Sequence, residues 1–146
     1  MKNDEFMTIA IQEARNSGVD VPVGVVIVKD GQVIARAHNE KEQLKDVSAH
    51  AEILALKRAS EKLGNWRLNG CKLYVTLEPC PMCASAIINS RVDEVYFGAY
   101  DNLYGALGSV LDLRKVYNSK LEVKGGILEE QCAELLKNFW SKNAKS

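Results

Sequence analysis

Residues 73–84 contain the stretch on which the fold prediction depends, and they read Leu73-Tyr74-Val75-Thr76-Leu77-Glu78-Pro79-Cys80-Pro81-Met82-Cys83-Ala84. The first half is apolar and rich in β-branched and aromatic residues, which predicts a strand over residues 72–77. Pro79 disfavours helical geometry in the residue before it, whereas Pro81 suits the first turn of a helix, where a missing N–H costs nothing. We therefore predict a strand that leads through a short connection into a helix over residues 81–89.

A second motif, His50-Ala51-Glu52, lies at the start of another predicted helix, over residues 49–63, for which Ser48 is the expected N-cap. Side chains two positions apart point in different directions in a regular helix. His50 and Glu52 can therefore face one pocket only if His50 lies at the helix start and Glu52 lies in the first turn.

Cys80 and Cys83 are three positions apart, so their thiols lie on one face of the first helical turn and can bind one ion. Together with His50 they form a three-ligand set, and catalytic zinc sites keep the fourth position for water. We predict one zinc per chain, bound by His50, Cys80 and Cys83. Glu52 is not needed as a ligand, and we predict that it carries protons to and from a zinc-activated water in a hydrolytic reaction.

The rest of the chain alternates between strand and helix patterns. A hairpin is predicted around the turn Asp30-Gly31, and both metal motifs fall at helix N-termini. Helices are expected over residues 4–16 and 129–140 besides the two above, and strands over residues 23–28, 33–37, 95–99 and 121–124. This order predicts one α/β domain, residues 1–146, with a mixed five-stranded sheet covered by helices on both faces.

Composition limits the possible functions. The 146 residues are 47% hydrophobic, and 19 basic residues balance 19 acidic ones. Zero net charge counts against broad, charge-driven RNA binding. The one basic cluster is the C-terminal Lys137, Lys142 and Lys145, which fits either phosphate contacts or a solvated helix end.

No apolar run approaches the ~20 residues of a membrane span, and residues 1–15 carry no signal-peptide pattern, so we expect no membrane segment. Cys71 and Cys132 are expected to be buried and to make no disulfide, which favours a cytoplasmic location.

Several stretches of the chain, in order, resemble one protein family: residues 21–28, 49–53, 73–84 and 97–109, within a similarity that runs from Phe6 to Trp140. The family is the bacterial tRNA-specific adenosine deaminases of the TadA type, in the zinc-dependent cytidine/deoxycytidylate deaminase superfamily. The resemblance implies a three-layer α/β/α cytidine-deaminase-like fold. It also implies conversion of the wobble adenosine of a tRNA anticodon loop to inosine, and a homodimer.

The same resemblance suggests substrate-binding residues. It implies that Asn39 hydrogen-bonds the flipped nucleoside and that Asp101 contacts an RNA sugar, although turn formation and loop capping are equally plain roles for these residue types. The family often has a basic residue where this chain has Leu103, and Tyr104 after it either stacks on a base or packs. Lys142 is a candidate phosphate contact.

Three further side chains receive structural interpretations. Glu78, which precedes the cysteine helix, is interpreted as structural support, with a role in orienting the metal ligands as the alternative. Trp66 and Trp140 are interpreted as packing residues rather than as platforms on which bases stack.

Two other functions share the metal motifs. A deaminase of a free base or nucleotide, such as guanine, cytosine or deoxycytidylate, would differ around residues 101–109 and in the C-terminal helix, which would close the pocket. A non-catalytic zinc-stabilised binding module would have no use for Glu52 beside the metal.

Overall fold

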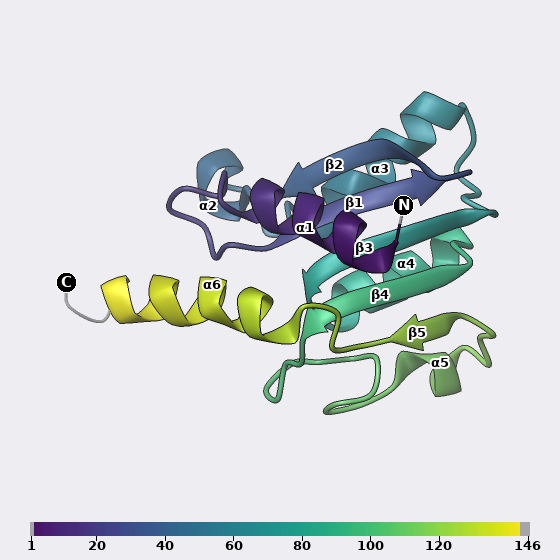
Figure 1. Cartoon of the computed structure of the whole chain (residues 1–146). Coiled ribbons are helices and arrows are strands. Elements are labelled where there is room, and N and C mark those ends of the chain that lie inside the picture. Colours follow the sequence, from purple (N-terminus) through teal and green to yellow (C-terminus); the bar gives the residue numbers. More distant parts are fainter. Residues whose placement is uncertain (1, 144–146) are drawn as a thin grey trace.

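The computed structural model describes residues 2–143 as a five-stranded sheet with helices on both sides (Figure 1). The strands are β1 (Gly24–Lys29), β2 (Gln32–His38), β3 (Cys71–Leu77), β4 (Glu94–Ala99) and β5 (Glu122–Lys124). The helices are α1 (Asn3–Ala14), α2 (Lys41–Leu44), α3 (Ala51–Leu63), α4 (Pro81–Ser90), α5 (Leu113–Val116) and α6 (Glu129–Asn143).

The sheet has the strand order β2-β1-β3-β4-β5. Strand β1 pairs antiparallel with both β2 and β3, while β3 pairs parallel with β4 and β4 with β5. The β1–β2 hairpin turns at Asp30 and Gly31, which have φ values of 50° and 76°, as a two-residue hairpin turn requires. As a result, four of these strands run in one direction, and β2, β3 and β4 end at the same edge of the sheet.

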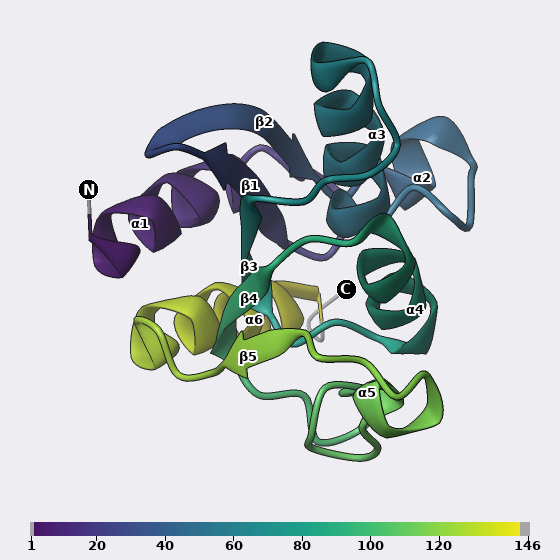
Figure 2. The ribbon, with the colours of Figure 1, turned by 90° about the vertical axis from the view of Figure 1, so that its right-hand side faces the viewer.

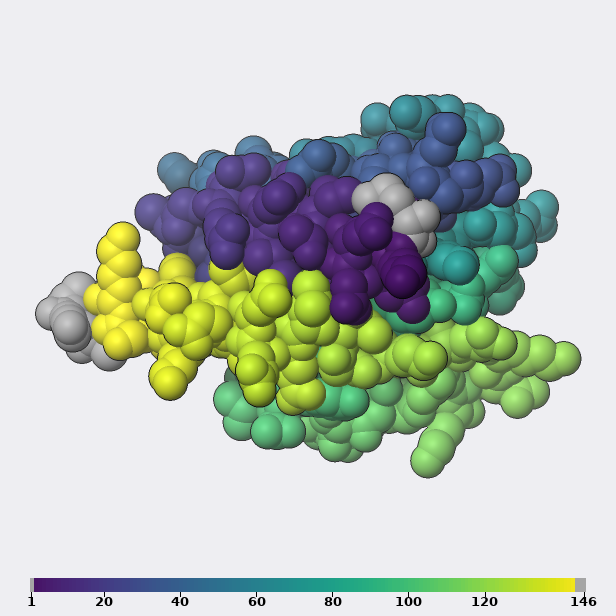
Figure 3. Space-filling view, in the orientation of Figure 1, coloured from purple at the N-terminus to yellow at the C-terminus, as the bar shows by residue number. Residues whose placement is uncertain are grey.

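Two apolar clusters cover the two faces of the sheet, and Figure 2 shows the layers side by side. Helices α3 and α4 pack against the face that carries Val25 and Ile27. Helices α1 and α6 pack against the opposite face, which carries Val26 and Val28. In the space-filling view α6 runs alongside α1 (Figure 3). The predicted mixed sheet with helices on both faces is therefore confirmed.

The main differences from the sequence predictions are at the ends of helices. Helix α3 begins at Ala51, with His50 as its N-cap, so the expected capping role of Ser48 is wrong. The amide and the hydroxyl of Ser48 instead donate to the Asp46 carboxylate within the loop. The short helices α2 and α5 were not predicted, and α6 continues three residues past the predicted end at Trp140.

Within residues 2–143, no helix has the length and apolarity that crossing a membrane requires.

Candidate active site

A cavity of about 590 Å³ opens where β2, β3 and β4 end. Asn39 follows β2, Glu78 follows β3, and Tyr100 and Asp101 follow β4, and all four line this cavity. Ligand sites in α/β proteins commonly lie outside the carboxyl ends of strands, because connections there diverge and leave a crevice. The cavity is therefore the candidate active site. Its lining also includes Asp20, Val21, Val23, Lys41, His50, Glu52, Leu77, Cys80, Asn102, Leu103, Tyr104, Leu136 and Trp140.

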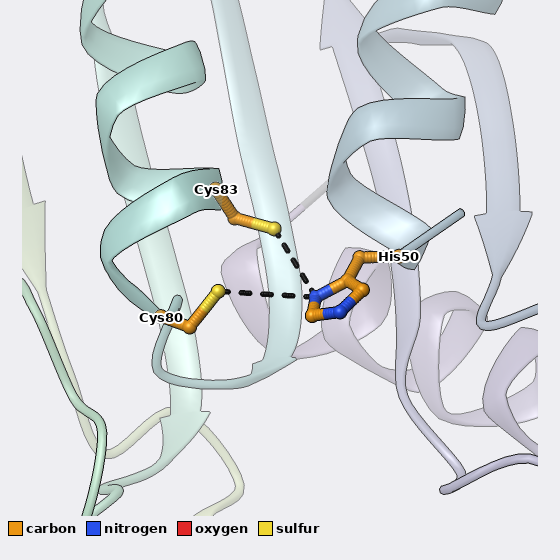
Figure 4. Close-up of side chains that lie close together, drawn as sticks. All are labelled: His50, Cys80 and Cys83. Atoms are coloured by element: carbon orange, nitrogen blue, oxygen red, sulfur yellow. Dashed lines mark hydrogen bonds between the residues drawn. The ribbon is translucent and has the colours of Figure 1, made fainter. Parts of the chain in front are cut away.

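The predicted metal ligands come together beside this cavity. His50 lies at the start of α3 and Cys80 at the start of α4, and Cys83 follows one turn into α4 (Figure 4). Neither His50 nor Cys80 uses its side chain to cap its helix. The Nδ1 atom of His50 is 3.8 Å from Sγ of Cys80 and 3.4 Å from Sγ of Cys83. The structure thus identifies Nδ1 as the nitrogen that faces both sulfurs.

These distances fit a tetrahedral zinc ion. With Zn–S near 2.3 Å and Zn–N of about 2.0–2.1 Å, tetrahedral angles place a sulfur and a nitrogen ligand about 3.5 Å apart. All three ligand atoms lie within 4.8 Å of one another. Among residues 2–143, no other set of three or more His, Cys, Asp or Glu side chains brings its ligand atoms together in this way.

The electrostatics of the cluster also favour a cation. The hydrogen bond from Cys83 lowers the pKa of Cys80 to about 4, and the contact with His50 acts in the same direction. The pKa of Cys83 is raised by the hydrogen bond with Cys80 and by burial, and that of His50 is raised by its bond with Cys80. Cys80 is therefore the thiol that more readily forms a thiolate, and the N-terminus of α4 stabilises its negative charge.

Cys71 and Cys132 lie apart from this cluster and are buried. Burial raises the pKa of both thiols, that of Cys132 to about 12, so neither readily forms a thiolate. Their predicted burial without a disulfide is confirmed.

Glu52 lies in the first turn of α3, lines the cavity and is 4% exposed. Burial raises the pKa of its carboxyl group to about 7, and the nearby charge of Cys80 contributes to the increase. It is not one of the three side chains whose ligand atoms come together. A carboxyl group that gains and loses a proton near neutral pH is suited to general acid–base chemistry.

Asn39 connects two elements of the site. Its side-chain oxygen accepts a hydrogen bond of 2.8 Å from the amide of Ala51, and its side-chain nitrogen donates to the carbonyl of Val21 at 3.0 Å. Asn39, rather than Ser48, thus satisfies an amide in the first turn of α3. Asn39, predicted from the sequence to be a substrate residue, lines the cavity and is held there by these two hydrogen bonds.

Asp101 caps the loop that follows β4. Its carboxylate oxygen Oδ1 accepts hydrogen bonds from the amides of Leu103 and Tyr104, at 2.9 and 3.0 Å. The loop-capping alternative is therefore confirmed, and the other oxygen remains available for a second contact. Leu103 and Tyr104 are 77% and 65% exposed and lie at the mouth of the cavity.

Part of the cavity wall was not predicted from the sequence. Trp140 and Leu136 on α6 line it, as does Tyr100, and Trp140 is 57% exposed, which favours the base-platform alternative over packing. Helical periodicity in α6 identified its buried side but not which turn reaches the cavity.

The C-terminal lysines do not line the cavity in the part of the chain that the structure describes. Lys142 lies in a small groove between α1 and α6, and Lys145 is outside the described residues.

Comparisons with known proteins agree with this geometry. The family model for MafB19-like deaminases matches residues 1–143. A tRNA-specific adenosine deaminase from Bacillus subtilis is 46% identical over 145 residues, which cover 96% of this chain and 90% of that protein.

Solved structures extend the comparison. One from work on A-to-I editing by tRNA:A34 deaminases at the wobble position of transfer RNA has a TM-score of 0.84 and 44% identity, and the match covers 90% of this chain and 99% of that one. A guanine deaminase from Bacillus subtilis has a TM-score of 0.67 and 36% identity, and the match covers 81% of this chain and 76% of that one. The expected deaminase fold is confirmed. The chain therefore belongs to the MafB19-like deaminase family and, within it, to the group of relatives named tRNA-specific adenosine deaminases.

Proposed function

We propose that this protein hydrolytically deaminates the wobble adenosine of a tRNA anticodon loop to inosine. The observation that carries the proposal is the buried carboxyl group of Glu52 beside the His50, Cys80 and Cys83 cluster, in a chain whose relatives are named for this reaction. A non-catalytic zinc module would not need a proton carrier at this place.

We propose that one zinc ion binds to Nδ1 of His50 and the thiolates of Cys80 and Cys83. When bound, zinc lowers the pKa of a coordinated water to about 7 and so provides a nucleophile at neutral pH. Zinc requires both thiols in the thiolate form, and the low pKa of Cys80 leaves only the Cys83 proton to be displaced.

The protein's own side chains would then hold the base and move protons. Glu52 takes a proton from the attacking water and delivers it to the departing exocyclic nitrogen of adenine, which leaves as ammonia. Asn39 retains a second side-chain N–H after its bond to Val21, and we propose that it donates to the flipped nucleoside. We propose that Asp101 accepts from a ribose hydroxyl and that Tyr104 stacks on a neighbouring base.

Deamination of free guanine is the second candidate, because the chain is 36% identical to a guanine deaminase with the same fold. The mouth of the cavity favours the RNA substrate. Leu103, Tyr104 and Trp140 are each more than half exposed there, so the pocket opens to the surface, whereas an enzyme for a free base gains from closing over it.

The two candidates can be separated with one purified sample. An anticodon stem-loop with adenosine at the wobble position should be converted to its inosine form with release of ammonia. Free guanine, cytosine and deoxycytidylate should react much more slowly. Faster turnover of free guanine than of the stem-loop would reject the proposed function.

We also propose a homodimer and a cytoplasmic location, which rest on the family and on the four free cysteines respectively. Sedimentation of the purified protein tests the dimer, and a monomer at working concentration would contradict it.

A further inference from the structure

Glu78 is a buried carboxylate, 1% exposed, whose two oxygens together accept four hydrogen bonds. Oε1 accepts from the amide of Asp101 at 3.2 Å and from the hydroxyl of Ser109. Oε2 accepts from the amides of Leu107 and Ser109, each at 3.1 Å. No described Lys, Arg or His side chain forms an ion pair with Glu78.

All four donors belong to one segment, residues 101–109, which follows β4 and includes the mouth of the cavity. The backbone of this segment lies close to the carboxyl group. A Cβ atom added to Gly105 would be 2.5 Å from Cδ of Glu78 and 2.4 Å from the carbonyl oxygen of Asp101, so only glycine fits. The loop is therefore wrapped around a single side chain.

The bonds continue from Glu78 to the rim of the cavity. Glu78 holds the amide of Asp101, and the Asp101 side chain in turn holds the amides of Leu103 and Tyr104. On its other side Glu78 is two residues from Cys80, and the carbonyl of the intervening Pro79 accepts from the amide of Ala106. One short segment thus supplies a metal ligand and the attachment of the substrate loop.

We propose that Glu78 is a positioning residue that sets the distance between the metal cluster and the substrate-binding loop residues Asp101 and Tyr104. The inference rests on the proposed function for its substrate. Glu78 does not touch the reacting base. Its effect is to hold the loop at the distance from the metal cluster at which Asp101 can contact a ribose while the base reaches the metal.

Glu78→Gln tests this role, because the structure predicts how glutamine must sit. The amide NH₂ cannot lie at the Oε2 position, where both partners are backbone N–H donors. It must lie at the Oε1 position, where the Ser109 hydroxyl can turn to accept but the Asp101 amide cannot. Glu78→Gln should therefore release Asp101 while Leu107 and Ser109 stay bound.

Two measurements follow. In hydrogen exchange followed by NMR, the Asp101 amide of Glu78→Gln should exchange faster than in the parent, while the Leu107 amide keeps its protection. KM for the anticodon stem-loop should rise about tenfold, as expected for losing one hydrogen bond to a charged group, with little change in kcat. Bound zinc should equal that of the parent.

Two further variants complete the test. Glu13→Gln makes the same change in a carboxylate that binds Arg36 and His38 away from the cavity, and KM should stay unchanged. Glu78→Asp keeps the charge but withdraws the oxygens by one methylene. Glu78→Asp should raise KM as well, and it serves as the test if Glu78→Gln does not fold.

The outcomes separate this inference from the proposed function. A parent protein that leaves the stem-loop unchanged rejects the proposed function itself. If the parent protein is active and both Glu78→Gln and Glu78→Asp have the KM of the parent, the proposed role of Glu78 is rejected. Loss of zinc and of kcat in both variants, with KM unaltered, would make Glu78 a support of the metal cluster instead.

Discussion

The side-chain oxygen of Asn39 lies 2.8 Å from the amide nitrogen of Ala51, one residue after His50, a proposed metal ligand. This bond joins the end of β2 to the start of α3 and so connects a proposed substrate residue to the metal cluster. Through it, the orientation of His50 depends on a residue 11 positions earlier in the chain.

The bond leads to a prediction for Asn39. Replacement by alanine should lower the free energy of unfolding by about 1–2 kcal/mol, because an amide at the N-terminus of α3 loses its acceptor. Asn39→Asp keeps the acceptor for Ala51, but it loses the donor to the carbonyl of Val21 and the N–H proposed to hold the nucleoside, so it should lose most deaminase activity. Urea unfolding and turnover are the measurements. Parental activity in Asn39→Asp would contradict the substrate role.

Metal content is expected to be one zinc per chain. Cys83→Ala should lose most of this zinc, because two ligands rarely hold zinc firmly. Cys71→Ala is the matched control, since this cysteine is also buried but lies apart from the cluster, and its zinc content should stay parental. Elemental analysis of the purified variants measures the zinc bound per chain. Zinc loss in the Cys71→Ala control would show that the ligand assignment is wrong.

Removing the carboxyl group of Glu52 should abolish turnover without removing zinc. Glu52→Ala should reduce kcat by at least about 10²–10⁴-fold, the usual contribution of general acid–base catalysis. Zinc content, measured in the same sample, should stay near that of the parent. If zinc disappears together with activity, Glu52 is a ligand or a structural element.

Glu52 should also make the stability of the metal-free protein depend on pH. Its pKa is about 7 in the folded protein against 4.5 for an unperturbed glutamate, so the folded state binds this proton more tightly than the unfolded state does. The contribution of the protonated Glu52 carboxyl group to the free energy of unfolding is therefore largest below pH 4.5. It decreases as the pH rises to about 7 and stays low above that.

The comparison with Glu52→Gln isolates this effect. Above about pH 8 the glutamine variant should be more stable than the parent by about 3 kcal/mol, and at low pH the two should be equal. Denaturant unfolding of both metal-free proteins across the pH range measures the difference. A constant difference at every pH would argue against a raised pKa.

Asp101→Asn should narrow the preference for RNA over DNA loops. The asparagine oxygen can still accept from the amides of Leu103 and Tyr104, so the loop keeps its shape, while the oxygen proposed to meet the 2′-hydroxyl is replaced. The readout is the ratio of turnover on matched RNA and DNA stem-loops. An unchanged ratio would remove the sugar contact from the proposal.

The sequence by itself determined the parts of the site that depend on local spacing. Cys80 and Cys83 share a face because they are one helical turn apart, and the two prolines around Cys80 place the start of that helix. The alternation of apolar segments was enough to predict the layered sheet.

Only the tertiary structure decided the features that depend on contacts between distant segments. Glu78 reaches donors 23 to 31 residues later in the chain, and no periodicity records such a bond. No local pattern in the sequence records the capping of α3 by Asn39 in place of Ser48, or the position of Trp140 at the cavity. Hydrogen bonds across a fold depend on where the strand ends meet, and this is set by packing of the whole sheet rather than by the local sequence.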